Sequence, residues 1–210
     1  MIAFFILQEG VSVVDKRYTD PFTALGPAVT DSGTGDYTKL AAWTSNGEKD
    51  PPCQKAGFVN TRFPIDLEVY DVPAQRKVYN DFAAGLKATP ALNNSLFLFE
   101  GYSLQGVKAV PADSTAFPFR QNNLLVAPLI IYSPAGKDLD KKAEKLGESL
   151  RQTLFKASGK KELQTYVNYA FGNENTKNWY GYEKWRQDRL LALKNKYDPD
   201  RKFSFYAPIA

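Results

Sequence analysis

Two stretches of the 210-residue chain carry an apolar residue about every four positions, and this spacing constrains the fold more than any other feature. The positions are Ala74, Val78, Phe82 and Leu86 in the first stretch, and Leu139, Ala143, Leu146, Leu150 and Leu154 in the second. The spacing predicts one helix that ends at Pro90 and another over about residues 138–155. Each helix has a single apolar stripe, which must be buried against a second layer of structure.

The segments around these helices are typical of β-strands. Residues 58–73 alternate apolar and polar side chains, residues 95–104 begin like a strand buried on both faces, and residues 123–132 form another apolar run. Pro128 within the last run predicts an edge strand or a bulge, because proline cannot donate to a strand ladder. We also expect a buried strand over residues 2–7.

The remaining segments complete the predicted fold. Residues 30–57 are rich in Gly, Asp, Thr and Pro and are expected to be mostly loop, and a last helix is expected over about 180–197, with a stop at Asp198-Pro199. The order of elements favours an α+β fold with a mostly antiparallel sheet covered by helices. We expect one domain over residues 1–210.

Composition removes several classes of function. The chain has no histidine and one cysteine, Cys53, so it cannot form an internal disulfide, a catalytic triad with histidine or a His-ligated zinc site. The net charge of +4 comes from well-mixed basic and acidic residues, which argues against nucleic-acid binding. The apolar run at 2–7 is too short to span a membrane and lacks a basic leading segment. We therefore expect a cytoplasmic protein.

Polar side chains on the predicted strand at 95–104 are the first candidates for a site. Alternation along a strand points Leu98, Glu100 and Tyr102 to one side. A carboxylate on a half-buried strand can act as an acid or base, although Glu100 could instead pair with a basic side chain at the sheet edge. Arg120 follows an aromatic-rich loop, where it could bind a substrate carbonyl or carboxylate, or anchor the loop to a backbone carbonyl.

A second group of candidates lies on the segment Tyr-Val-Asn-Tyr that begins at Tyr166. In an extended segment Tyr166 and Asn168 share one side, and Tyr169 faces the other. A phenol and an amide can both donate hydrogen bonds to a developing oxyanion. Tyr169 is interpreted mainly as a core residue.

Four stretches of the sequence carry a resemblance to a known family. The stretches 165–174 (TYVNYAFGNE), 179–203, which ends in a Tyr-Asp-Pro stop, 99–125 and 18–27 occur in the family's order. The chain resembles the substrate domain of FAD-linked oxidoreductases of the vanillyl-alcohol oxidase and berberine bridge enzyme type, with about 160–210 as its C-terminal segment. The resemblance implies that Tyr166 and Asn168 match residues that face the flavin.

The resemblance also implies what this sequence does not contain. The family binds FAD in a separate, earlier domain that often attaches the flavin through histidine and cysteine, and no such domain is found here. Phe119 stands where the family commonly has histidine, before Arg120, and Ala109 is the approximate match to an acidic base of plant members. Phe119 is therefore expected to contact substrate, together with Leu98, Tyr102 and Asn168.

These observations leave three hypotheses. The first is a cofactor-independent enzyme that cyclises or isomerises a hydrophobic natural-product intermediate, with Glu100, Arg120 and Tyr166 as catalytic residues. The second is a fragment or subunit of an FAD-linked oxidoreductase, with FAD supplied by a partner chain. The third is a ligand-binding protein without catalysis. The expected partners are a hydrophobic small molecule and either a flavin-domain protein or a second copy of the chain.

Overall fold

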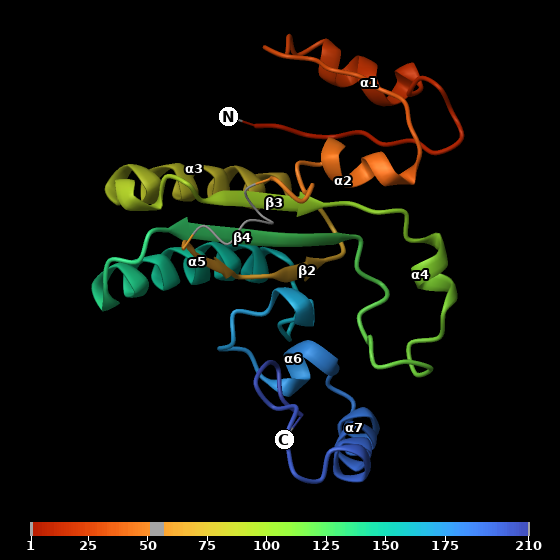
Figure 1. The fold of residues 1–210 in the computed structure, drawn as a ribbon, viewed down its shortest axis with the longest axis vertical. Coiled ribbons are helices and arrows are strands. Elements are labelled where there is room, and N and C mark those ends of the chain that lie inside the picture. Colours follow the sequence, from red (N-terminus) through yellow and green to blue (C-terminus); the bar gives the residue numbers. More distant parts are fainter. Residues whose placement is uncertain (1, 51–56, 210) are drawn as a thin grey trace. The chain divides into compact units, whose positions relative to one another are not determined.

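The structure, a computed structural model, describes residues 2–50 and 57–209 and divides into two compact units, residues 1–56 and 57–210. Cys53 lies outside the described residues. Most of the predicted elements fall in the second unit, which contains a four-stranded sheet and its helices (Figure 1). The assignment of residues 1–210 to a single substrate domain stays a prediction.

The N-terminal unit contains short helices joined by long loops. Its elements are α1 (Lys16–Thr23), the 3₁₀ turn η1 (Tyr37–Lys39) and α2 (Leu40–Trp43). The prediction of a buried strand over residues 2–7 is wrong: this segment is irregular, and Phe5 is 57% exposed. An apolar run becomes a strand only where a neighbouring strand satisfies its backbone, and no described strand pairs with this one.

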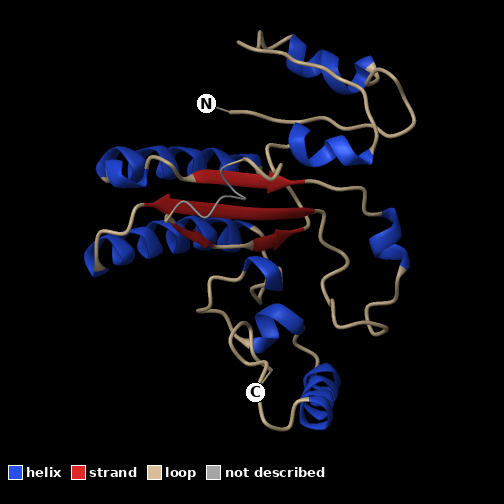
Figure 2. Ribbon diagram, viewed as in Figure 1, coloured by secondary structure: helices blue, strands red, loops and turns tan. Residues whose placement is uncertain are grey.

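The sheet of the second unit is antiparallel, as predicted. Its strands are β1 (Val59–Arg62), β2 (Ile65–Leu67), β3 (Leu96–Glu100) and β4 (Leu124–Tyr132). The long strand β4 pairs with β1 and then β2 along one edge and with β3 along the other, as Figure 2 shows. The sequence thus predicted the three strand regions and the fold class, α+β.

Two details of the strand predictions are corrected by this topology. Pro128 lies in the central strand rather than at an edge, and the β1–β2 ladder is interrupted beside it, where Phe63 N–H donates to its carbonyl at 3.0 Å. The strand β3 is an edge strand, so its first residue, Leu96, is 46% exposed instead of buried on both faces. A strand is buried on both faces only where a layer of structure covers each face of the sheet.

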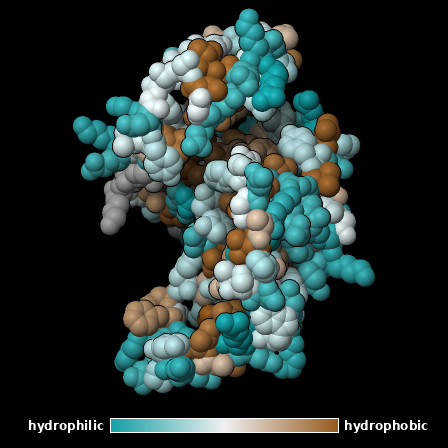
Figure 3. Space-filling view, turned by 90° about the vertical axis from the view of Figure 1, so that its right-hand side faces the viewer, coloured by the Kyte–Doolittle hydropathy of each residue, from teal (hydrophilic) through white to brown (hydrophobic). Residues whose placement is uncertain are grey.

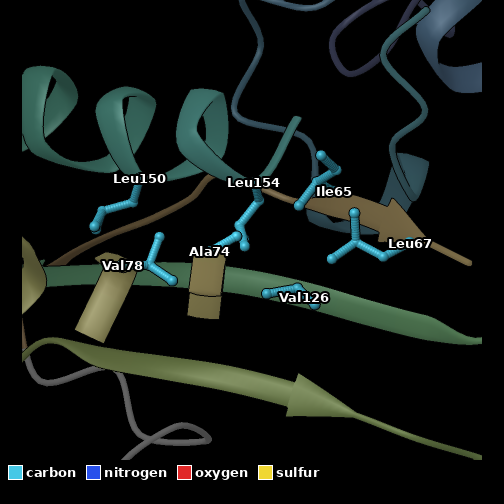
Figure 4. Packing of buried hydrophobic residues seen from close by; sticks show 7 residues of the cluster. All are labelled: Ile65, Leu67, Ala74, Val78, Val126, Leu150 and Leu154. Atoms are coloured by element: carbon cyan, nitrogen blue, oxygen red, sulfur yellow. The ribbon is translucent and has the colours of Figure 1, made fainter. Parts of the chain in front are cut away.

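The two helices predicted from apolar spacing cover one face of the sheet. They are α3 (Val72–Ala88), capped by the Asp71 carboxylate on Ala74 N–H at 2.7 Å, and α5 (Lys137–Ala157). Figure 4 shows how side chains from both helices meet those of β2 and β4 in the core. The cluster consists of Ile65, Leu67, Ala74, Val78, Val126, Leu150 and Leu154.

A glycine in α5 allows the helix to lie close to the sheet. A Cβ atom added at Gly147 would lie 2.1 Å from the ring of Phe63, which is fully buried. The close approach explains why this helix position carries no side chain, despite the cost of glycine within a helix. The ring of Phe63 also stacks on Phe171 at 4.4 Å, so it joins the sheet to the segment that follows α5.

The remaining elements of the second unit are helices and 3₁₀ turns. They are η3 (Pro90–Leu92) and α4 (Gln105–Ala109) before β4, and η4 (Val167–Tyr169), α6 (Thr176–Tyr180) and α7 (Lys184–Tyr197) after α5. The helix predicted over 180–197 begins later, because Gly181 takes a positive φ of 97° that ends α6. The predicted stop at Asp198 is confirmed.

A buried ion pair fixes the region after α5. Arg151, which is 2% exposed, lies on α5 and donates to the Glu174 carboxylate, whose side chain is fully buried, and to the carbonyl oxygen of the Asn173 side chain at 2.8 Å. Glu174 in turn accepts the backbone N–H of Gly172 at 2.8 Å. The charges are compensated by each other and by hydrogen bonds, as a buried pair requires.

The surface mixes polar and apolar groups. On the face shown in Figure 3, hydrophobic side chains are interspersed with hydrophilic ones. In the part of the chain that the structure describes, no helix combines the length and the apolar character needed to cross a membrane.

Candidate functional site

The pairing register assigns the side chains of the sheet to two faces. The face covered by α3 and α5 carries Ile65 and Val126. The other, here called the outer face, carries Arg62 from β1, Asp66 from β2 and Glu100 from β3, because these residues pair with Leu129 and Leu125 of β4. The outer face therefore gathers three charged residues from three strands.

Glu100 is the centre of a hydrogen-bonded cluster on this face. One oxygen of its carboxylate, Oε2, accepts the phenolic O–H of Tyr102 and, at 3.4 Å, that of Tyr169. The other oxygen, Oε1, is buried and has no hydrogen-bond partner among the described residues. A buried acceptor without a donor is costly, so it marks a position where a further donor would bind favourably.

The segment 166–169 brings its aromatic rings onto the outer face. The Tyr169 ring packs edge-on against that of Tyr166 at 5.4 Å and lies 5.1 Å from the guanidinium carbon of Arg62. Asn168 is exposed, and its amide donates to the Tyr166 hydroxyl at 2.8 Å. The prediction that Tyr169 faces away from Tyr166 is wrong, because the segment forms the 3₁₀ turn η4 instead of an extended chain.

The phenols of the cluster hold their protons firmly. Burial raises the pKa of Tyr169 to about 12, and the negative charge of Glu100 adds to the rise. Burial, followed by the hydrogen bond to Glu100, raises the pKa of Tyr102 still further. Although 65% of Tyr102 is exposed, its hydroxyl end is the part held against the carboxylate. Both phenols therefore act as hydrogen-bond donors at neutral pH, not as bases.

The other predicted site residues lie in β3 or in the loop 101–123. Leu98 is half-buried on the outer face, two residues before Glu100. Phe119 is half-buried in the loop, and Ala109 ends α4. Phe117, which the sequence did not single out, packs edge-on against Tyr166 at 6.5 Å. The loop is thereby connected to the aromatic rings on the outer face.

Arg120 anchors the loop to which it belongs. Its guanidinium donates to the Val107 carbonyl at 3.1 Å and to the Thr115 hydroxyl at 2.6 Å, and it lies 5.4 Å from the Phe117 ring. The anchoring role is therefore the one that the contacts support. A role for Arg120 in binding substrate stays a prediction.

Two charged residues of the outer face were missed by the sequence analysis. Arg62 carries a buried Nε with no hydrogen-bond partner among the described residues, and Asp66 is 5% exposed. Burial raises the pKa of Asp66 to about 7, opposed by the positive charge of Lys160. The signal that could have identified both was their place in 58–73, where they alternate with core residues.

Two small hollows are found among the described residues of this unit. One, of about 250 Å³, is lined by residues that include Arg62, Asn168, Tyr169 and Tyr206, and another of about 160 Å³ lies beside α7. Both are below the roughly 300–1,000 Å³ of typical small-molecule pockets, so neither could enclose a dinucleotide. The Asn168 amide donates to the Tyr166 hydroxyl at 2.8 Å, and a contact of either residue with a flavin stays a prediction.

The chain is similar in sequence to known oxidoreductases. No protein-family model matches the chain. Over all 210 residues the chain is 50% identical to the FAD-linked oxidoreductase chyH of Penicillium rubens and 48% identical to the FAD-linked oxidoreductase chry5 of Gibberella zeae. It is a partial-length homologue of FAD-linked oxidoreductases. It spans 42% of the length of these relatives.

The fold of this oxidoreductase homologue is also found in a solved structure. The berberine bridge enzyme from Eschscholzia californica matches 95% of the chain with a TM-score of 0.65 at 17% identity, and the match covers 44% of that enzyme. The predicted resemblance to the berberine bridge type is confirmed, and so is the α+β fold. The comparisons do not test the roles of Glu100, Arg120, Tyr166 or the other site residues.

Proposed function

We propose that this chain forms the substrate-binding part of an FAD-linked oxidoreductase, and that residues outside the 210-residue sequence hold the flavin. The proposal is supported by the similarity to FAD-linked oxidoreductases and by the Glu100 cluster. The single observation that carries it is the buried Oε1 of Glu100, which has no donor among the described residues.

The arrangement favours a hydrophobic substrate that carries an O–H or N–H group. The surroundings of Glu100 are aromatic, with Tyr102, Tyr166 and Tyr169 within one connected group. Such rings bind apolar surface, while Oε1 accepts the donor of the substrate and orients it. Tyr102 is the most exposed of the three rings, so we propose that it moves aside to admit the substrate.

In this function Glu100 receives the proton that the substrate loses. Oxidation of an alcohol to a carbonyl releases one proton and one hydride equivalent. A bound flavin supplies the acceptor for the hydride. Tyr166 and Asn168 would contact that flavin, and Tyr169 keeps its proton and holds Glu100 in place when Tyr102 has moved. Arg62, stacked near Tyr169, would balance the negative charge of the cluster.

The test separates binding of flavin from binding of substrate. FAD is added to the purified chain and to the chain mixed with the flavin-bearing part of the Penicillium relative, and flavin fluorescence is recorded. Vanillyl alcohol, which has an aromatic ring and two hydroxyl groups, serves as the substrate probe. We expect binding of the probe to weaken at least about tenfold in Glu100→Gln, because an amide cannot replace a charged acceptor. Unchanged binding in that variant would refute the proposal.

A second candidate function is cyclisation or isomerisation without a cofactor. The observation that favours it is that an acceptor carboxylate and two protonated phenols all belong to this chain, as acid-base catalysis requires. It predicts turnover by the chain alone, with FAD absent and with full dependence on Glu100. Binding without turnover in every mixture would instead support a ligand-binding protein. A cytoplasmic location also stays a prediction.

A further inference from the structure

Within the loop 101–123, the segment 111–116 has little apolar packing to hold it in place. All residues from 111 to 116 are exposed, and the hollow of about 160 Å³ separates part of this segment from α7. Loops held mainly by polar contacts take their position from those contacts, because apolar burial contributes little. The hydrogen bonds made by this segment therefore decide where the loop lies.

Arg186 of α7 supplies two of these hydrogen bonds. Its guanidinium donates to the Thr115 carbonyl at 2.9 Å and to the Ala112 carbonyl at 2.8 Å, and Nε donates to the Glu183 carboxylate at 3.2 Å. All three groups are acceptors that suit the fixed fork of an arginine. Arg186, at 2% exposure, is the only buried residue of α7, so this helix buries a charge where an apolar residue is usual.

The surrounding sequence is adapted to this arginine. Gly181 takes a φ of 97°, and a Cβ atom there would lie 2.9 Å from Arg186 Nε and 3.0 Å from its Cδ. Thr115 accepts hydrogen bonds from two arginines: Arg186 donates to its carbonyl, and Arg120 donates to its hydroxyl at 2.6 Å. Two residues further on, Phe117 packs against Tyr166, which packs against Tyr169 beside Glu100. Contacts therefore connect Arg186 to the cluster without a break.

We propose that Arg186 is a positioning residue, which with Arg120 fixes the loop 101–123 against the aromatic cluster of the candidate site. The inference rests on the proposed function, because it assigns Arg186 to the same site. Arg186 touches neither Glu100 nor its phenols. It acts by fixing the backbone of residues 112–115, and thereby Phe117, so that the rings around Glu100 keep their arrangement.

The experiment compares Arg186→Ala, Arg186→Lys and the control Arg189→Ala. Arg189 is exposed on the same helix and lines the same hollow, so its removal changes the net charge equally. Hydrogen exchange of the loop amides is measured together with that of β4 and α5. We expect exchange of the hydrogen-bonded amides within residues 107–120, such as Ser114 N–H, which donates to the Pro111 carbonyl at 3.1 Å, to rise at least about tenfold in Arg186→Ala. It should rise less in Arg186→Lys and stay unchanged in Arg189→Ala.

A second readout reports on the site itself. Spectrophotometric titration follows ionisation of the tyrosines, and the high pKa of Tyr169 depends on its burial and on Glu100. In Arg186→Ala this late ionisation should move towards lower pH, and Arg186→Lys should restore most of the original curve. Vanillyl alcohol binding should weaken in parallel.

Three outcomes would overturn the inference. They are unchanged exchange in the loop, an equal rise in exchange throughout residues 57–210, and a mobile loop with an unchanged tyrosine titration. Arg186→Lys keeps the charge, so it gives an answer even if Arg186→Ala does not fold. Failure of the proposed function is seen separately, as probe binding that does not depend on Glu100 in a protein with an intact loop.

Discussion

The buried carboxyl of Asp66 makes the stability of this protein depend on pH in an unusual direction. Asp66 is 5% exposed on β2, and its pKa rises from 3.8 to about 7 because burial disfavours the charged form, with Lys160 opposing the rise. Lys160 itself pairs with Glu68 at 3.1 Å and donates to Asn122 at 2.5 Å, so its charge is shared. We predict that Asp66→Asn stabilises the protein at neutral pH and above.

The direction of this pH dependence follows from the pKa values of Asp66 in the unfolded and the folded protein. Below about pH 4 Asp66 is protonated in both the folded and the unfolded protein, so it causes no loss of stability. Between about pH 4 and pH 7 the unfolded protein releases the proton while the folded protein keeps it, and the free energy of unfolding falls by up to about 1.4 kcal/mol per pH unit. Above about pH 7 the full loss is present.

The rise of the Asp66 pKa from 3.8 to about 7 limits the loss of unfolding free energy to about 4 kcal/mol. Relaxation and water entry reduce the penalty for a buried charge, so we expect Asp66→Asn to gain about 2–4 kcal/mol at about pH 8. The amide has nearly the shape of the carboxyl but carries no charge. The Asp66 backbone N–H, which donates to the Gln164 carbonyl at 3.0 Å, is unaffected.

The assay is urea unfolding followed by far-ultraviolet circular dichroism, at several values from about pH 5 to about pH 8. The difference in unfolding free energy between Asp66→Asn and the unaltered protein should widen as pH rises. Asp188→Asn is the matched control, because this carboxylate is 60% exposed and should show no such trend. Parallel curves for Asp66→Asn and the unaltered protein, or a difference that shrinks with pH, would refute the reasoning.

Three further predictions concern packing, charge and the candidate site. Arg151→Ala should lower the unfolding free energy by about 3–5 kcal/mol, because it leaves the buried carboxylate of Glu174 without its partner. Gly147→Ala should cost about 1–3 kcal/mol in the same urea assay, because the added methyl would lie 2.1 Å from the Phe63 ring. Glu100→Gln should lower the pKa of Tyr169 from about 12, measured by absorbance titration: burial, the main cause of the rise, is kept, but the nearby negative charge that adds to it is removed.

Each of these predictions has a control on the same protein. Lys184→Ala removes an exposed ion pair and should change stability by no more than about 1 kcal/mol. Gly106→Ala adds a methyl with no atom within 4 Å, so it should be neutral or stabilising. Asp140→Asn should lower the pKa of Tyr132 alone. Equal effects in a variant and its control would contradict the corresponding prediction.

The sequence by itself determined the elements whose signal is local. Helices α3 and α5 follow from apolar residues about four positions apart, because residues at this spacing lie on one side of a helix. The end of α7 follows from Asp198-Pro199, because Pro199 has no backbone N–H to continue the helix. The α+β class follows from the order of these elements. Glu100 was also predicted as a site residue from strand alternation alone, although its catalytic role stays a prediction.

Tertiary structure decided how distant residues meet. Tyr169 and Glu100 are 69 positions apart, and Arg186 and Thr115 are 71 apart, so no local pattern predicts either contact. The same reason explains the errors at 2–7, at β3 and at Pro128, since pairing and burial of a strand depend on its neighbours in the sheet. Local propensity chooses helix or strand, but the chemistry of a buried carboxylate depends on which donors the fold places beside it.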